Sequence, residues 1–477
     1  MKTAIFSCVA ALACLADAAT VESVSISQMW PVSTDVKVNY VLNGVSEPVD
    51  VSVAVLDGEA EISLAGTDSM FLRGDVYGVS TDGPHVLYLD PTQLKSSMPA
   101  FTSSFKVRLT LSASPANISE AIYKIVDMND GTVTHLTRAD IKNGRYGSWT
   151  DDMEATFGIT NSVDDLLVWT GVTNDLRWAK DKMVFRKIPA GGKTFRMGAQ
   201  DGEADASATR QKAYTATLSK DFWMGVFEVT QYQFRKISNS NPSVFSTDDD
   251  ADVHPVDNIY WTLIRGSSDG KKWSADATSV DAIHASVDST SFLGRFRAKN
   301  PSALAMLDLP SDVQWEVAAR ANVLATFYDG YLNTNGADGH AGPHVGLLGR
   351  YSGNGGIDGT VTNGTVRVGS YIPNQYGLYD VLGNVSELTG DVFMETPANQ
   401  TVFPSGTEWL DPVGGYNKSQ YDTADGYNGA SGNSDRCAQR GGNWALGPRF
   451  CNLSYRPKNS RSSSVSSQGF RLCIKED

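Results

Sequence analysis

Glycine is the feature that most limits how this chain can fold. The sequence contains 44 glycines against 18 prolines, and the glycines are densest after residue 330. Glycine weakens both helices and strands, so a segment as glycine-rich as 335–369 is not expected to be regular. We predict that this segment is irregular and that side chains, water or metal satisfy its backbone polar groups.

Length and charge limit the possible classes further. The chain has 477 residues, and at roughly 150 residues per domain this suggests about three domains. Hydrophobic residues make up 41% of the chain, which excludes disorder for most of it. The formal net charge of −14 argues against a nucleic-acid partner, because phosphate binding needs a surplus of cations.

The first 18 residues have the pattern of a signal peptide. Lys2 precedes an apolar run from Ala4 to Leu15, and the small residues Ala16 and Ala18 follow. The run is too short to span a bilayer, so cleavage after Ala18 and export are expected. A lipoprotein site at Cys14 is the alternative. We predict a secreted, periplasmic or cell-surface protein without a membrane span.

Cleavage would leave three cysteines, Cys437, Cys451 and Cys473. Three is an odd number, so at most one disulfide can form within the chain. An oxidising exterior is compatible with one bridge near the C-terminus. The sequence leaves the pairing open.

Residues 20–113 have the pattern of antiparallel strands. Apolar and polar residues alternate in Val36–Leu42, Val51–Leu56 and Phe105–Leu111, and the first two runs end at Asn-Gly and Asp-Gly turns. Several such strands in under a hundred residues predict a β-sandwich of the immunoglobulin or fibronectin type. We find no catalytic constellation in it and interpret it as a spacer or docking module.

Residues 114–184 form a second, shorter strand-rich unit. Ile122–Asp127 is predicted to be a strand that ends in a turn over Met128–Gly131. Aromatic residues recur through the unit, and we interpret them as packing residues rather than as a ligand platform. They are Tyr146, Trp149, Phe157, Trp169 and Trp178.

Two helices are predicted after residue 185. The first covers Thr230–Ile237 and the second covers Ser311–Ala321. Ser311 is a suitable N-cap for the second helix, because its hydroxyl can accept a hydrogen bond from a free backbone N–H. Glu316 and Arg320 lie four residues apart in this helix and can pair on its surface.

Short motifs follow one another in a fixed order from residue 185 onward. They are Ile188–Gly192, Phe195–Gly198, Phe222–Gly225, Glu228–Thr230, His254–Val256, Leu309–Arg320, Asn374–Glu387, Arg440–Trp444 and Gly469–Leu472. In this order they resemble the sulfatase-modifying-factor domain, the fold of formylglycine-generating enzyme, over residues 185–475. The resemblance implies an α+β, C-type-lectin-like fold with little regular structure.

The resemblance also implies an activity whose residues are incomplete here. The family's oxidase binds copper(I) with two cysteines five residues apart, and one of them forms a disulfide with the substrate cysteine. In this sequence the first position is Leu446 and the second is Cys451. Because leucine cannot bind a soft metal or exchange disulfides, we expect neither copper nor oxidation. Cys451 remains a candidate catalytic residue, against the alternatives of a buried thiol or half of a disulfide.

A calcium site is the second feature that the resemblance implies. Asp380, Gly383, Val385 and Glu387 match the family's calcium loop. Ca²⁺ takes several oxygen ligands, so the two carboxylates and the carbonyls of the other two residues would be its donors. The alternative is that Glu387 only accepts hydrogen bonds from backbone amides. The family's other calcium site is not recognisable.

Two histidines offer a weaker metal candidate. His340 and His344 are four residues apart, but glycines and a proline surround them, which predicts a loop. A zinc or iron site there is poorly supported without a helix to align the two rings.

Residues 444–468 mix serine, arginine, asparagine and aromatic side chains without hydrophobic periodicity. Adaptable binding surfaces use the same residue types. In the family that this chain resembles, the corresponding stretch lines the substrate cleft. The fold also resembles that of the variable proteins of diversity-generating retroelements, whose diversified residues lie in the same C-terminal stretch. A solvated structural loop is the alternative. The predicted ligand-cleft residues are Trp444, Leu446, Arg449, Phe450, Asn452, Tyr455 and Arg456.

Three functions are therefore compatible with the sequence. The first is a non-oxidase member of the family that binds a peptide, protein or glycan in the cleft. The second is a divergent oxidase that modifies a sulfatase through Cys451, and the third is a structural envelope component. Leu446 separates the first from the second.

Overall fold

The computed structural model describes most of the chain after the predicted signal peptide. The described residues are 19–29, 33–62, 72–90, 105–204, 206–207, 210–211, 213–266, 287–336, 338–354, 364–393 and 436–476. The predicted signal peptide, residues 1–18, lies outside them. They form two compact units: the first comprises the described residues up to Ile122 together with Leu136–Thr150 and Trp169–Asn174, and the second comprises the rest.

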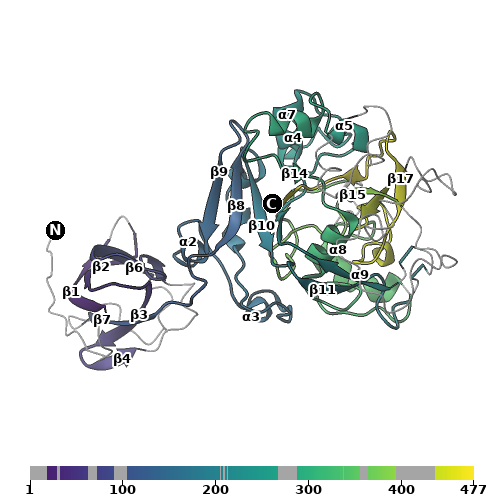
Figure 1. Cartoon of the computed structure of the whole chain (residues 1–477). Coiled ribbons are helices and arrows are strands. Elements are labelled where there is room, and N and C mark those ends of the chain that lie inside the picture. The colour runs from purple at the N-terminus through teal and green to yellow at the C-terminus, as the bar shows by residue number, and fades with distance from the viewer. Residues whose placement is uncertain are drawn as a thin grey trace. The chain divides into compact units, whose positions relative to one another are not determined.

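The first unit contains two antiparallel sheets (Figure 1). One sheet has the order β1 (Thr20–Gln28), β2 (Val36–Asn43), β6 (Gly83–Leu89) and β5 (Leu72–Gly74), and the other has β4 (Ala60–Ile62), β3 (Val49–Asp57) and β7 (Phe105–Ala113). Every second residue of β2 is buried, which is the pattern of a strand with one face in a core. The three strands predicted in residues 20–113 are confirmed as β2, β3 and β7.

Short helices complete the first unit. Helix α2 (Arg138–Lys142) begins at the N-cap Thr137, whose hydroxyl accepts from the amide of Asp140 while the Asp140 carboxylate accepts from Thr137. A 3₁₀ turn, η2, covers Thr170–Thr173. Trp149 and Trp169 are buried, which agrees with the packing role predicted for them.

The second unit is built on a six-stranded sheet (Figure 1). Its order is β14 (Leu307–Asp308), β19 (Cys473–Lys475), β13 (Phe222–Gly225), β10 (Lys182–Ile188), β8 (Ala121–Asp127) and β9 (Val133–Thr137). Strand β8 is the strand predicted at Ile122–Asp127, and it pairs antiparallel with β10. Strands from residues 114–184, which the sequence analysis treats as a separate short unit, thus share a sheet with β19, the last strand of the chain.

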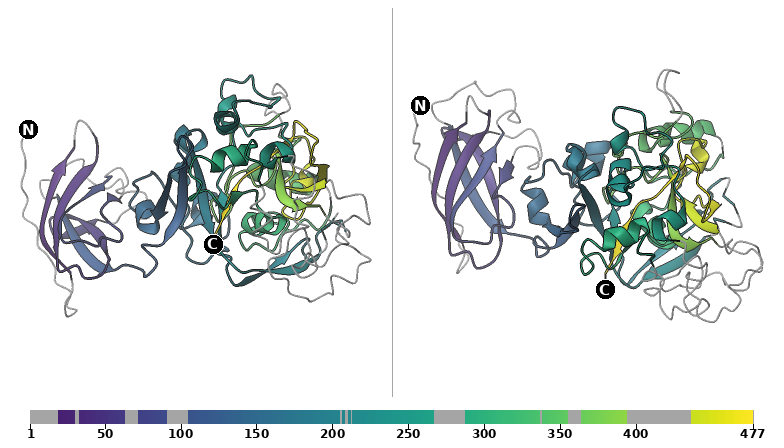
Figure 2. Two further views of the ribbon diagram at one scale, coloured as in Figure 1. Left: turned by 45° about the horizontal axis from the view of Figure 1, so that its top comes forward. Right: turned by 90° about the horizontal axis from the view of Figure 1, so that it is seen from above.

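Two smaller sheets lie in the same unit. One joins β17 (Lys458–Ser460), β16 (Arg436–Arg440), β15 (Ser386–Val392) and β18 (Gln468–Gly469), and the other joins β11 (Lys193–Met197) to β12 (Tyr214–Leu218). The C-terminal strands, drawn in yellow, lie within the larger unit in both views of Figure 2. Strand β15 pairs with β16 so that Glu387 lies opposite Arg440 and Leu388 opposite Gln439. This pairing places the predicted calcium loop next to the Arg-Gly-Gly motif.

The α-helices that the described residues of the second unit form are short. They are α3 (Met153–Phe157), α4 (Gln231–Ser238), α5 (Trp261–Arg265), α7 (Phe292–Arg297), α8 (Asp312–Arg320) and α9 (Asp338–Leu348). Further 3₁₀ turns are η3 (Leu176–Ala179), η4 (Ala251–Val253) and η6 (Pro448–Phe450). Both predicted helices are confirmed: Thr230 caps α4 and Ser311 caps α8, each in a reciprocal pair with a glutamine three residues later.

Helix α9 corrects the prediction for the glycine-rich segment. Residues 338–348 form a helix of 11 residues that contains Pro343. The expectation of an irregular 335–369 is therefore wrong over these residues. Pro343 is the sixth of the eleven residues, so the helix lacks one internal backbone hydrogen bond there, and Ala341, Val345 and Leu348 are buried. Packing of these side chains outweighs the low helix propensity of glycine.

Candidate functional site

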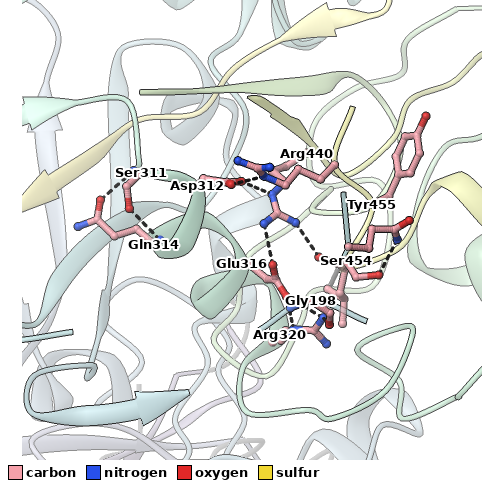
Figure 3. A network of polar contacts seen from close by, with 12 residues as sticks. Gly198, Ser311, Asp312, Gln314, Glu316, Arg320, Arg440, Ser454 and Tyr455 are labelled. Atoms are coloured by element: carbon pink, nitrogen blue, oxygen red, sulfur yellow. Dashed lines mark hydrogen bonds and ion pairs between the residues drawn. The ribbon is translucent and has the colours of Figure 1, made fainter. Parts of the chain in front are cut away.

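Helix α8 carries the acidic half of a buried ion-pair network (Figure 3). Asp312 accepts hydrogen bonds from Arg440 and Arg456. Glu316 accepts one from Arg440 at 2.6 Å and one from Arg320 at 2.8 Å. All five side chains are at most 5% exposed. The charges alternate along the network, so each buried ion has at least one partner of opposite sign.

The network sets the ionisation of its acids. Burial opposes ionisation of Asp312, but Arg440 and Arg456 outweigh it and hold the pKa of that carboxyl below its ordinary value. Burial likewise opposes ionisation of Glu316, and Arg320 with Arg440 keeps its pKa low. The acids are therefore charged at neutral pH, which fixes Arg440 and Arg456 on helix α8.

Two predicted cleft residues, Asn452 and Arg456, hold the C-terminal segment in place. The Asn452 side-chain oxygen accepts from the amides of Ser454, at 3.0 Å, and Tyr455, at 2.6 Å. Ser454 donates to Glu203 at 2.8 Å, and Arg456 is bound to Asp312. Asn452 and Arg456 are 6% and 5% exposed, so both side chains are buried in the second unit.

Other predicted cleft residues lie at the surface of the same segment. Arg449 is exposed, and its guanidinium carbon lies 4.8 Å from the centroid of the Phe450 ring. Phe450 and Tyr455 are partly exposed, with ring centroids 5.3 Å apart. Leu446 is also partly exposed. The cation and the two rings form one continuous group, which we call the Arg449 surface.

Trp444 lies at the edge of this segment and packs inward. Its ring meets Phe245 edge to face, with centroids 5.2 Å apart. Its Nε1 donates to the backbone oxygen of Ser466 at 3.2 Å. Trp444 is partly exposed, and its two contacts join the segment around Phe245 to the segment around Ser466.

Helix α9 borders the Arg449 surface, and the sequence did not predict this contact. Helix α9 lies against η6, and Asp338 at its start is 3.8 Å from Arg449. No sequence pattern indicates this contact, because glycines and Pro343 predict a loop over the residues that form α9.

Cys451 is buried below the Arg449 surface. Its side chain is 0% exposed, and its thiol lies 3.6 Å from the backbone oxygen of Asn443, to which it donates. Burial raises the pKa of the Cys451 thiol to about 12. Gly442 lies directly against it: a Cβ at this glycine would be 2.7 Å from the sulfur. The thiol is thus protonated and enclosed.

The three C-terminal thiols do not form a disulfide. Cys437, Cys451 and Cys473 are all free and buried, so the expectation of one bridge near the C-terminus is wrong. The Cys437 thiol donates to the backbone oxygen of Asn459 at 3.4 Å. The three thiols lie at different places in the second unit: Cys437 in β16, Cys451 directly after η6 and Cys473 in β19.

Among the predicted calcium ligands, Asp380 has one carboxylate oxygen without a hydrogen-bond partner. Its backbone is in the left-handed region, with φ 55°. Oδ2 accepts from the amide of Gly369 at 2.6 Å, whereas Oδ1 is buried and has no hydrogen-bond partner. Burial raises the pKa of Asp380 to about 7. An unpaired buried carboxylate oxygen is a position that a cation would stabilise.

Glu387 is engaged differently. Its two oxygens accept from Nε and Nη2 of Arg471, each at 2.7 Å, and Oε2 also accepts from Trp315 at 2.7 Å. Gly383 has φ +82°, and a Cβ there would meet the backbone oxygen of Arg350 at 2.1 Å, so only glycine fits. Val385 donates its amide to buried Glu228 at 3.2 Å. The predicted calcium set fits only in part: Asp380 offers an oxygen, and Glu387 forms an ion pair.

Comparisons with known proteins identify the second unit. Residues 176–476 match the family model of the sulfatase-modifying factor enzyme 1-like domain. This chain belongs to that family. The expected α+β fold with little regular structure is confirmed. A comparison with curated proteins finds no match.

Several solved structures are similar to this family member. The variable protein 1 of Treponema denticola is 20% identical, with a TM-score of 0.41, over 62% of this chain and 96% of its own. PvdO from Pseudomonas aeruginosa is 17% identical, with a TM-score of 0.38, over 61% and 94%. CarF is 19% identical, with a TM-score of 0.31, over 61% and 99%.

No helix in the described residues of this sulfatase-modifying-factor chain is long and apolar enough to cross a membrane. The same residues contain no group of three or more His, Cys, Asp or Glu side chains arranged to hold a metal ion.

Proposed function

We propose that this chain is an exported member of the sulfatase-modifying-factor family that binds a peptide, protein or glycan and does not oxidise cysteine. The observation that carries the proposal is the burial of Cys451. A thiol acts as nucleophile or metal ligand only as the thiolate. With a pKa of about 12 and no exposed surface, Cys451 stays a thiol at neutral pH.

Leu446 supports the same conclusion. It stands at the position of the first thiol of the family's pair, and a hydrocarbon side chain provides no ligand for copper(I). The remaining thiols cannot substitute where they lie, because Cys437 and Cys473 contact the oxygens of Asn459 and Gln314. These contacts support the proposal that no two-thiolate copper site forms at Cys451.

The Arg449 surface supports the binding part of the proposal. Arg449, Phe450 and Tyr455 offer a planar cation and two rings in contact with one another. Arginine and tyrosine are enriched at binding hot spots, and a guanidinium held against a ring is already oriented for a partner. The network beneath this surface fixes the backbone, because Asp312 holds both Arg440 and Arg456. A rigid support of this kind lowers the entropy cost of binding.

Oxygen consumption tests the non-oxidase part. Purified protein loaded with copper(I) is mixed with a cysteine-containing sulfatase peptide, and oxygen uptake is followed with an electrode. We expect no uptake above that of the Cys451→Ala variant. Turnover that depends on Cys451 would support the divergent oxidase instead.

Binding arrays test the other part. The protein is screened on glycan and peptide arrays together with the variants Phe450→Ala and Tyr455→Ala. The matched control is Arg177→Ala, whose side chain is exposed in the same unit. We expect a wild-type signal that both surface variants lose and the control keeps. A signal unaffected by the two surface variants would place binding elsewhere, and no signal at all would favour a structural role.

A further inference from the structure

Helix α9 brings two histidines to one of its faces. His340 and His344 are four residues apart within Asp338–Leu348. Side chains at this spacing lie one above the other on an α-helix, with Cβ atoms about 5–6 Å apart. His340 is exposed and His344 is partly exposed, so solvent reaches both rings. Two imidazoles on consecutive turns can bind one metal ion together.

His344 is already oriented as a metal ligand would be. Its Nδ1 is hydrogen-bonded to the carboxylate of Asp329. Its ring is stacked on Tyr331, with centroids 3.8 Å apart and an angle of 9° between the planes. Metal-binding histidines are commonly held through their second ring nitrogen by a carboxylate, which fixes the tautomer and makes the ligating nitrogen more basic. In His344 this leaves Nε2, on the far edge of the ring, as the ligating atom.

The histidine face of α9 is separate from the Arg449 surface. Asp338 lies 3.8 Å from Arg449, and a Cβ at Gly342 would lie 4.0 Å from Pro448 of η6. Residues 338 and 342 therefore point toward η6. Residues 340 and 344 are offset by about half a turn from 342, and His344 contacts Asp329 and Tyr331 instead. A site at the histidines is thus independent of the proposed ligand surface.

We propose that His340 and His344 together bind one divalent transition-metal ion, with Asp329 as a positioning residue. Imidazole nitrogen suits zinc, nickel, cobalt and copper(II), whereas calcium and magnesium require oxygen ligands. The described part of the chain assembles no group of three ligating side chains. Water or a bound molecule therefore completes the coordination sphere, as in metal sites with open positions.

Calorimetric titration with zinc tests the proposal. The mature protein, without an affinity tag, is treated with a chelator, dialysed and titrated with Zn²⁺. We expect one ion per chain for the wild type, and loss of this binding in His340→Ala and in His344→Ala. Asp329→Asn should weaken binding by about 10–100-fold, the usual cost of removing the carboxylate that is hydrogen-bonded to a metal-binding histidine. His135→Ala is the control, because His135 is exposed and lies outside α9.

Two results would overturn the proposal. One is a wild-type protein that binds none of Zn²⁺, Ni²⁺ and Co²⁺ under these conditions. The other is a His340→Ala variant that keeps full binding. Because His340 is exposed, its replacement tests the site without disturbing the packing around His344, and circular dichroism confirms that the variant is folded.

Discussion

Arg471 and Glu387 form a two-point ion pair in the interior of the second unit. Nε and Nη2 of Arg471 each donate to one oxygen of Glu387 at 2.7 Å, and both side chains are 1% exposed. The pair connects the segment before β19 to strand β15. Two parallel charge-assisted hydrogen bonds fix both distance and orientation. The two charges compensate each other only while both residues are present.

Glu387→Gln should therefore destabilise the second unit strongly. The variant leaves the Arg471 charge buried without its carboxylate, and losing one partner of a buried pair costs about 3–5 kcal/mol. The measurement is urea unfolding followed by tryptophan fluorescence. The control is Asp201→Asn, because Asp201 pairs with Arg196 while 93% exposed, and an exposed pair contributes about 0–1 kcal/mol. Equal effects of the two variants would contradict this account.

Calcium should stabilise the protein through Asp380. The carboxylate has one buried oxygen without a hydrogen-bond partner, and a cation bound there would offset the cost of its burial. At a calcium concentration about 100 times the dissociation constant, a single site adds roughly 2.7 kcal/mol to stability. We expect Ca²⁺ to raise the melting temperature of chelator-treated protein and to leave Asp380→Asn unchanged. An identical shift in both proteins would exclude Asp380 as the ligand.

Asp257 should make stability depend on pH. Burial raises the pKa of its carboxyl to about 6 from 3.8, although the amides of Val244 and Phe245 donate to it. The folded state thus takes up the proton more readily than the unfolded state. The contribution of the protonated Asp257 carboxyl to the free energy of unfolding is therefore complete below about pH 4. It is lost as the pH rises through about 6.

The test compares unfolding free energies of the wild type and Asp257→Asn at several pH values. The difference between them should change by about 1.4 kcal/mol per pH unit at most, in favour of the wild type as the pH falls from about 6 to 4. A difference that is constant over this range would show that Asp257 ionises normally in the folded protein.

The parts of the fold that depend on neighbours in sequence were predictable. Alternation gave strand β2 at Val36–Asn43, and the capping pair of Ser311 and Gln314 accompanies helix α8. Helix α9 was not predicted because its glycines and Pro343 indicate a loop. The burial of Ala341, Val345 and Leu348 stabilises the helix, and this burial depends on tertiary packing that the local sequence does not show.

Exposure of the candidate site residues could be predicted only in part. Arg449, Phe450 and Tyr455 are at least partly exposed, and their role in a ligand cleft stays a prediction. Arg456 is buried instead, because Asp312, which is 144 positions away in sequence, pairs with it. No local pattern indicates such a partner. The contact between His344 and Asp329 was not predicted either, because the sequence indicates a loop at His344 rather than a helix that fixes its side chain.

Alkylation of Cys451 in the native protein tests the central claim most directly. The protein is exposed to iodoacetamide at pH 8, and modification of each cysteine peptide is followed by mass spectrometry with and without urea. A thiol that is 0% exposed, with a pKa of about 12, should react only when the second unit unfolds. Its rate should then equal those of Cys437 and Cys473, which are equally buried. Rapid modification of Cys451 alone, without urea, would mean an accessible thiolate and would contradict the account.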